Sequence, residues 1–148
     1  MLDRQTPHQT HALELQRFAI RVTPMRGADA KVIRRFGQRL DEYLLQRNLY
    51  FTGTPWVAII RSNKRDLTVV DQIELLAWVL EDELCASVCL SPLTHCVATE
   101  LGAEIAWVKV NRMDLTVAAT HWLYRWGHLD ASAVLRILES NRVTQVPI

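Results

Sequence analysis

The sequence predicts an α+β protein: a ferredoxin-like split β-α-β-β-α-β core over residues 14–96 and a C-terminal β-α-α-β extension over residues 97–148. Two observations favour this fold class. The apolar patterns between Gln16 and Ser91 read strand, helix, strand, strand, helix, strand, with a Gly-containing hairpin in the middle. A chain of 148 residues that is 49% apolar and 22% charged can also bury a core without disulfide staples. Such a sheet has one helix-covered face and one open face, so we expect function to lie on exposed surfaces.

The chain opens with a polar stretch that leads into the first strand. Residues 1–13 contain no apolar period and are predicted to form a flexible tail. Residues 16–23 alternate in character, with Phe18, Ile20 and Val22 on one face. This period of two predicts a strand.

An amphipathic helix is predicted from Asp29 to Arg47, because apolar residues recur there with a helical period. The face opposite the apolar stripe is largely basic. Its cations are Lys31, Arg34, Arg35 and Arg39, accompanied by the single carboxylate of Glu42. Two interpretations stay open. The charges either only solvate the exposed side of the helix, or they form a surface that contacts phosphate groups or an acidic partner.

A β-hairpin is predicted from residues 48–53 and 55–62, joined by a turn that contains Gly53. A polar loop with Lys64 and Arg65 follows the hairpin. This loop would enlarge the basic surface if the fold brings it beside the first helix.

The second helix is predicted from Thr68 to about Leu84, with Thr68 as the N-cap and Asp71 completing a variant capping box. Trp78 lies outside its apolar stripe, with Leu75 on the same side, where a monomeric helix is normally polar. Either the C-terminal third of the chain covers these two side chains, or they bind a partner, because tryptophan is enriched at interface hot spots.

After a strand at residues 86–91, the extension is predicted to contain two helices between two strands. The expected ranges are a strand at 104–111, a helix capped by Asp114 and ending at Trp126, a helix from Asp130 to Asn141, and a strand at 142–146. The first of these helices has an apolar stripe that we expect to be core, because two tryptophans offer the largest area to bury. The stripe consists of Leu115, Ala118, Ala119, Trp122 and Trp126.

The charge of the chain is unevenly distributed. Residues 1–65 carry 12 Lys or Arg against 5 Asp or Glu, a net +7, whereas residues 66–148 carry 5 against 11, a net −6. The total of +1 is too low for a strongly basic nucleic-acid binder, although a local basic face remains possible. The two helices of the extension have the proportions of a helix-turn-helix motif. The net negative charge of this half of the chain argues against sequence-specific DNA binding.

Composition also predicts the compartment. No stretch approaches the ~20 apolar residues of a membrane span, and the polar N-terminus lacks the apolar segment of a signal peptide. The odd number of cysteines, Cys85, Cys89 and Cys96, argues for reduced thiols. We therefore expect a cytoplasmic protein.

Catalytic and metal motifs are weak in this sequence. Cys85, Cys89, His95 and Cys96 are close together but contain no Cys-x-x-Cys knuckle, so buried free thiols are the better interpretation than zinc. Neither a Gly-rich phosphate loop after a strand nor a Gly-x-Ser-x-Gly elbow occurs. We expect a protein that is not an enzyme, without catalytic residues, cofactor or metal. A pocket that holds His121 or His128 beside a carboxylate would favour the remaining alternative, that the protein is a small hydrolase or transferase.

From Phe18 to about His95 the chain resembles the YggL-like family, small bacterial proteins associated with the large ribosomal subunit. The resemblance rests on the hairpin segment Asn48-Leu49-Tyr50-Phe51-Thr52-Gly53, on Ala77-Trp78-Val79, and on Ser91-Pro92-Leu93. It covers about half of the chain, and its motifs are structural rather than catalytic. It implies a partner in the large ribosomal subunit or another RNA–protein complex.

The leading functional prediction is a non-catalytic binding module that docks on a large complex through its basic surface. That surface would be formed by Lys31, Arg34, Arg35, Arg39, Lys64 and Arg65. The alternative is a protein-binding adaptor or inhibitor, such as an immunity protein or phage-type blocker, that uses Leu75, Trp78 and the acidic second half. Homodimerisation through that same patch fits equally well.

Overall fold

A computed structural model describes residues 15–95 and 106–143 of the chain, and the side chains within these ranges up to residue 140. The fold is α+β, as expected: helices pack on an antiparallel sheet whose strand order is β2-β3-β1-β4-β5-β6. The strands are β1 (Phe18–Pro24), β2 (Tyr50–Gly53), β3 (Val57–Arg61), β4 (Cys85–Leu90), β5 (Trp107–Asn111) and β6 (Arg142–Val143). The helices are α2 (Ala30–Leu45), α3 (Val69–Leu80), α5 (Leu115–Arg125) and α6 (Ala131–Leu138), followed by a 3₁₀ turn at Glu139–Asn141.

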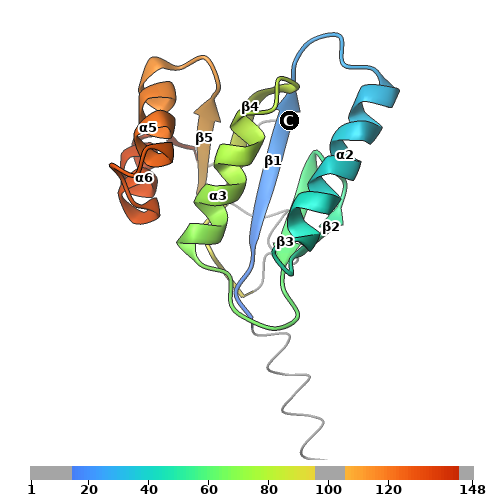
Figure 1. The fold of residues 1–148 in the computed structure, drawn as a ribbon, viewed down its shortest axis with the longest axis horizontal. Coiled ribbons are helices and arrows are strands. Elements are labelled where there is room, and N and C mark those ends of the chain that lie inside the picture. Colours follow the sequence, from blue (N-terminus) through green and yellow to red (C-terminus); the bar gives the residue numbers. More distant parts are fainter. Residues whose placement is uncertain (1–14, 96–105, 144–148) are drawn as a thin grey trace, which may run out of the picture.

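The extension continues the same sheet. Val88 of β4 pairs with Val110 of β5, and Trp107 of β5 pairs with Val143 of β6. Figure 1 shows the helices in a row, with α2 at the right, α3 in the middle and the α5–α6 pair at the left. The predicted tail at residues 1–13, the start of the predicted strand at 104 and the end of the strand at 146 lie outside the described residues.

One face of the sheet carries the main core. Phe18, Ile20 and Val22 of β1 are buried on this face, as their alternation predicts. They pack in one cluster with Phe36 of α2 and Ile73 of α3. The same cluster includes residues of β5, α5 and α6, so the extension shares the core with the first part of the chain.

The second face of the sheet is less open than expected. Ala19, Ile59, Cys89 and Trp107 alternate with core-facing residues on their strands, and all four are buried. The expectation of an open second face is therefore wrong for the centre of the sheet. The sequence already carries apolar residues on both faces of these strands.

The helix starts follow from local capping. Asp29, Asp114 and Asp130 each accept a hydrogen bond from a backbone N–H in the first turn of their helix. Thr68 and Asp71 form the predicted capping box at the start of α3, where the Thr68 N–H donates to the Asp71 carboxylate. The helix ends were predicted less well, since α3 stops at Leu80 rather than near Leu84.

No helix within residues 15–95 and 106–143 is long and apolar enough to cross a bilayer.

The β2–β3 turn depends on Gly53, which has a φ of +103°. A Cβ at this position would lie 2.5 Å from the Val57 carbonyl oxygen. We therefore expect Gly53→Ala to lower the free energy of unfolding by roughly 2–4 kcal/mol, because strain at positive φ adds to a backbone clash. Chemical denaturation followed by circular dichroism measures the loss.

Gly127→Ala is the matched control for Gly53→Ala. Gly127 has a φ of +83° but no atom within 4 Å of the added Cβ. We expect Gly127→Ala to lower the free energy of unfolding by about 1–2 kcal/mol, because only the positive φ disfavours the alanine. Equal losses in the two variants would contradict the close approach of Gly53 to β3.

Candidate functional site

Three cations on the first half of α2 form an exposed group, called here the basic face: Lys31, Arg34 and Arg35. Within the described part of the chain, none of their side chains forms a hydrogen bond or an ion pair. The first turn of α2 also contains no acidic residue. These charges are therefore available to a partner.

Two of the other predicted cations, Arg39 and Arg65, form ion pairs within the fold instead. Arg39 pairs with Asp82 after α3, with 2.7 Å between Nη2 and Oδ2. Arg65 makes two bonds of 2.7 and 2.8 Å to the carboxylate of Asp71. Both arginines keep exposed surface, but their charges are already matched by carboxylates inside the molecule.

Lys64 and Arg65 also lie away from the basic face. Their loop contacts the start of β1, where the Leu67 N–H donates to the Gln16 carbonyl, whereas α2 follows the end of β1. Figure 1 shows the loop before α3 at the lower end of the sheet and the start of α2 at the upper end. The predicted single basic surface is therefore not formed, and it reduces to the basic face on α2.

The predicted anchor formed by Leu75 and Trp78 is not an exposed surface. Leu75 is only 1% exposed. Trp78 is half-buried against α2, with its ring centroid 5.8 Å from that of Phe36 and 4.9 Å from that of Tyr43. Aromatic side chains of α2 face α3 and cover part of the indole.

The exposed aromatic surface is found on α5 instead. Leu115 is 86% exposed, Trp122 51% and Trp126 68%. With the exposed Ala119 they occupy positions i, i+4, i+7 and i+11, which lie along one side of a helix. We call these four residues the aromatic face. The prediction that this stripe is core is wrong.

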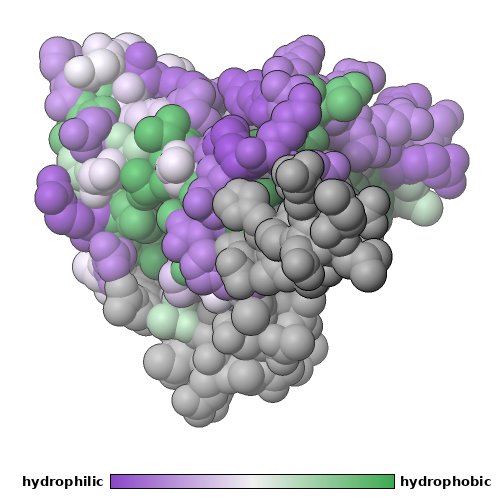
Figure 2. Space-filling view, turned by 90° about the horizontal axis from the view of Figure 1, so that it is seen from below, coloured by the Kyte–Doolittle hydropathy of each residue, from purple (hydrophilic) through white to green (hydrophobic). Residues whose placement is uncertain are grey.

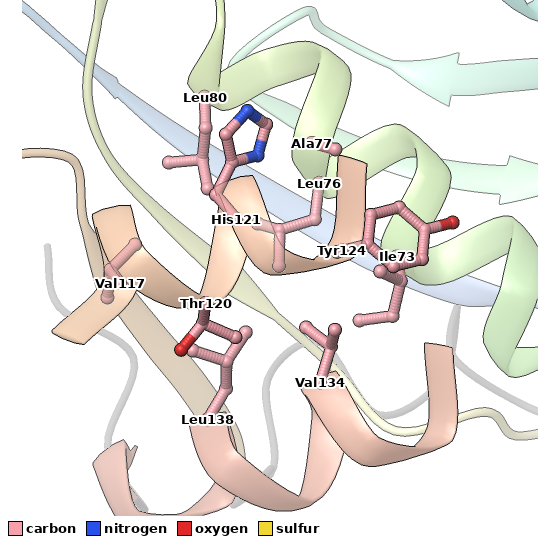
Figure 3. A pocket seen from close by; sticks show the side chains of 10 residues that line it. All are labelled: Ile73, Leu76, Ala77, Leu80, Val117, Thr120, His121, Tyr124, Val134 and Leu138. Atoms are coloured by element: carbon pink, nitrogen blue, oxygen red, sulfur yellow. The ribbon is translucent and has the colours of Figure 1, made fainter. Parts of the chain in front are cut away.

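The opposite side of α5 packs inward, as Figure 3 shows. Val117, Thr120, His121 and Tyr124 line a cavity with residues of α3 and α6. The cavity has a volume of about 20 Å³, room for roughly one water molecule, and its walls are mostly apolar. It is a packing gap rather than a ligand site.

Polar contacts to α3 orient α5. The Tyr124 hydroxyl donates to the Glu74 carboxylate. Glu81 accepts from Arg125 at 2.7 Å and lies 2.9 Å from Nε2 of His121. These contacts require Tyr124 and His121 to face α3, which turns Trp122 and Trp126 outward.

His121 also borders a surface hollow of about 350 Å³, shared with Glu81, Arg112 and Trp122. This is the arrangement of histidine beside carboxylate that would indicate catalysis. Burial, together with the positive charge of Arg125, lowers the pKa of His121, although Glu81 opposes this. The described lining of the hollow, however, offers no hydroxyl, thiol or amine nucleophile. The His121–Glu81 pair is therefore best explained as a contact that positions α5 against the end of α3.

The remaining candidate ligands do not converge. Cys85 and Cys89 are buried free thiols, and burial raises the pKa of Cys85 to about 12. His128 lies in the exposed turn after α5. Cys96 lies outside the described residues. Among residues 15–95 and 106–143, no three His, Cys, Asp or Glu side chains come close enough to share a metal ion.

Comparison with known proteins adds no identification. No protein-family model, no curated protein and no solved structure matches the chain.

The Arg65–Asp71 pair predicts a pH dependence of stability. Burial alone would raise the pKa of Asp71, but hydrogen bonds from Arg65 and Thr68 outweigh it and hold the pKa below its ordinary value. A lowered pKa stabilises the fold above the ordinary value of about 3.9, and this contribution is lost as the pH falls through the folded-state pKa. We expect Asp71→Asn to cost about 1 kcal/mol at pH 7 and progressively less below pH ~4.

Urea denaturation at pH 7, 5, 4 and 3 measures this difference. Asp41→Asn is the matched control, because Asp41 is exposed on α2 and has no bonded side-chain partner in the described part of the chain. A loss in Asp71→Asn that stays constant across the pH range would contradict the pairing.

Proposed function

We propose that the protein is a non-catalytic binding module that docks through the basic face on an anionic partner, an RNA–protein complex such as the large ribosomal subunit. One contrast carries this proposal. Arg39, Arg47, Arg65 and Arg125 pair with carboxylates of the chain, whereas Lys31, Arg34 and Arg35 have no such partner among the described residues and lie together on one helix turn, unlike single unpaired cations elsewhere such as Arg136.

The position of these cations on α2 supports the proposal. Lys31 lies in the first turn, beside the partial positive charge of the helix N-terminus. The cap residue Asp29 contributes the nearest negative charge, since the first turn itself has none. Cations placed there repel the helix dipole, and contact with phosphate groups relieves this repulsion.

We also propose that β1, β2, β3 and β4 with α2 and α3 form a ferredoxin-like split β-α-β core. The strand order β2-β3-β1-β4 supports this, as does the position of α2 between β1 and β2 and of α3 between β3 and β4. The resemblance of residues 18–95 to the YggL-like family supports the ribosomal subunit as the partner. Such a partner would place the protein in the cytoplasm.

Neutralising one residue of the basic face tests the docking. We expect Arg34→Gln to weaken co-sedimentation with purified large ribosomal subunits about tenfold at low salt. The slope of log K against log salt should fall by about 1, because one phosphate contact is lost. Arg136→Gln on α6 is the control, since Arg136 is also exposed.

Two outcomes would contradict the proposal. The first is failure of the wild-type chain to sediment with subunits at low salt. The second is an equal effect of Arg34→Gln and Arg136→Gln, which would show that only net charge matters.

A further inference from the structure

We propose that the aromatic face is the interface of a homodimer, in which α5 of one protomer packs antiparallel against α5 of its partner. This inference stands on α5 and does not depend on docking by the basic face of α2.

The aromatic face is too apolar for a helix side that stays in water. A tryptophan side chain offers roughly 200 Å² to a contact. With Trp122 51% and Trp126 68% exposed, the two indoles present about 240 Å². Their ring centroids are 6.0 Å apart, so they form one surface rather than two isolated groups. Nothing in the described part of the chain covers them.

The exposed apolar area corresponds to a small dimer interface. Leu115 is 86% exposed at the start of α5, and Leu123, one turn from Ala119 and Trp126, is 40% exposed. With these two side chains the apolar surface reaches about 450 Å² per protomer. A two-fold contact buries the same patch on both protomers, so the total is about 900 Å², the size of a weak, concentration-dependent interface. Figure 2, seen from below, shows other hydrophobic residues at the surface on the side where α5 and α6 lie and mainly hydrophilic residues on the side of α2.

The order of residues on the aromatic face suits an antiparallel pair. A two-fold axis midway between Ala119 and Trp122 sets Ala119 opposite the partner's Trp122 and Leu115 opposite the partner's Trp126. Each pair joins a smaller side chain to an indole, so two copies of the face interdigitate. A parallel pair would instead set Trp122 against the partner's Trp122, at one crowded level.

Charge does not oppose this contact. The four residues of the aromatic face are all uncharged, and the neighbouring Arg125 is already bonded to Glu81. Arg112, which borders Trp122, donates to the Glu83 carbonyl and lies in the open hollow beside the face, where its charge can stay in contact with water. The two helix dipoles run in opposite directions in this arrangement, which is the favourable one.

Sedimentation velocity between about 1 and 500 µM tests the proposal. We expect the wild-type chain to shift with concentration from 17.0 kDa toward twice that mass. Ala119→Glu places a charge at the centre of the contact and should weaken the dimer at least 100-fold. Ala30→Glu is the matched control, because Ala30 is an exposed alanine on α2, and it should leave the dimer intact.

Circular dichroism checks that both glutamate variants are folded, and Trp126→Gln replaces Ala119→Glu if the latter is not. A wild-type chain that stays monomeric at 500 µM overturns the proposal, as does equal dimerisation of Ala119→Glu and Ala30→Glu. An unlike protein that occupies the aromatic face of a monomeric chain overturns it as well.

Cysteine crosslinking tests the direction of the helices in a Cys96→Ser background. The double variant Leu115→Cys/Trp126→Cys should form an oxidised dimer, whereas each single variant should not. Crosslinking of Leu115→Cys with its own copy would overturn the antiparallel arrangement.

Discussion

The carboxylates of Glu74 on α3 and of Glu81, the residue at the C-cap of that helix, determine which side of α5 faces the core. Tyr124 donates its hydroxyl to Glu74, and Arg125 and His121 contact Glu81. Burial, followed by the bond to Glu74, raises the pKa of Tyr124, so the hydroxyl stays protonated as a donor. The rotation of α5 is thereby set by its polar contacts, and the larger apolar side chains are left on the surface.

Much of the fold could be predicted from the sequence, because local signals and tertiary packing agree there. The alternation of β1, the N-caps Asp29, Thr68 and Asp114, and the turn at Gly53 all lie where their patterns indicate. The orientation of α5 could not be predicted from apolar periodicity, because Trp122 and Trp126 form the most apolar stripe and yet face outward. Tyr124 lies 50 positions from Glu74 and Arg125 lies 44 from Glu81, so no local pattern in the sequence indicates the contacts that orient α5.

The basic face and the aromatic face lie at opposite ends of the row of helices. Figure 1 places α2 at one end, α5 and α6 at the other, and α3 between them. A dimer through α5 therefore leaves the basic face of each protomer free. When the basic face of one protomer has bound a polyanion, the basic face of its partner is held close to the same polyanion. Its effective concentration is thereby raised, so the dimer binds more tightly than either protomer alone. The aromatic cluster of Phe36, Tyr43 and Trp78 joins α2 to α3 and keeps this geometry rigid.

The most direct test of the account is a double-mutant cycle between Glu74 and Tyr124, measured as free energies of unfolding in urea. Glu74→Gln, Tyr124→Phe and the double variant isolate the contact that orients α5. We expect a coupling energy of about 1.5–3 kcal/mol, the value of a hydrogen bond to a charged acceptor. A coupling energy near zero would show that this contact does not hold α5, and would contradict the claim that the polar contacts to Glu74 and Glu81 set the rotation of α5.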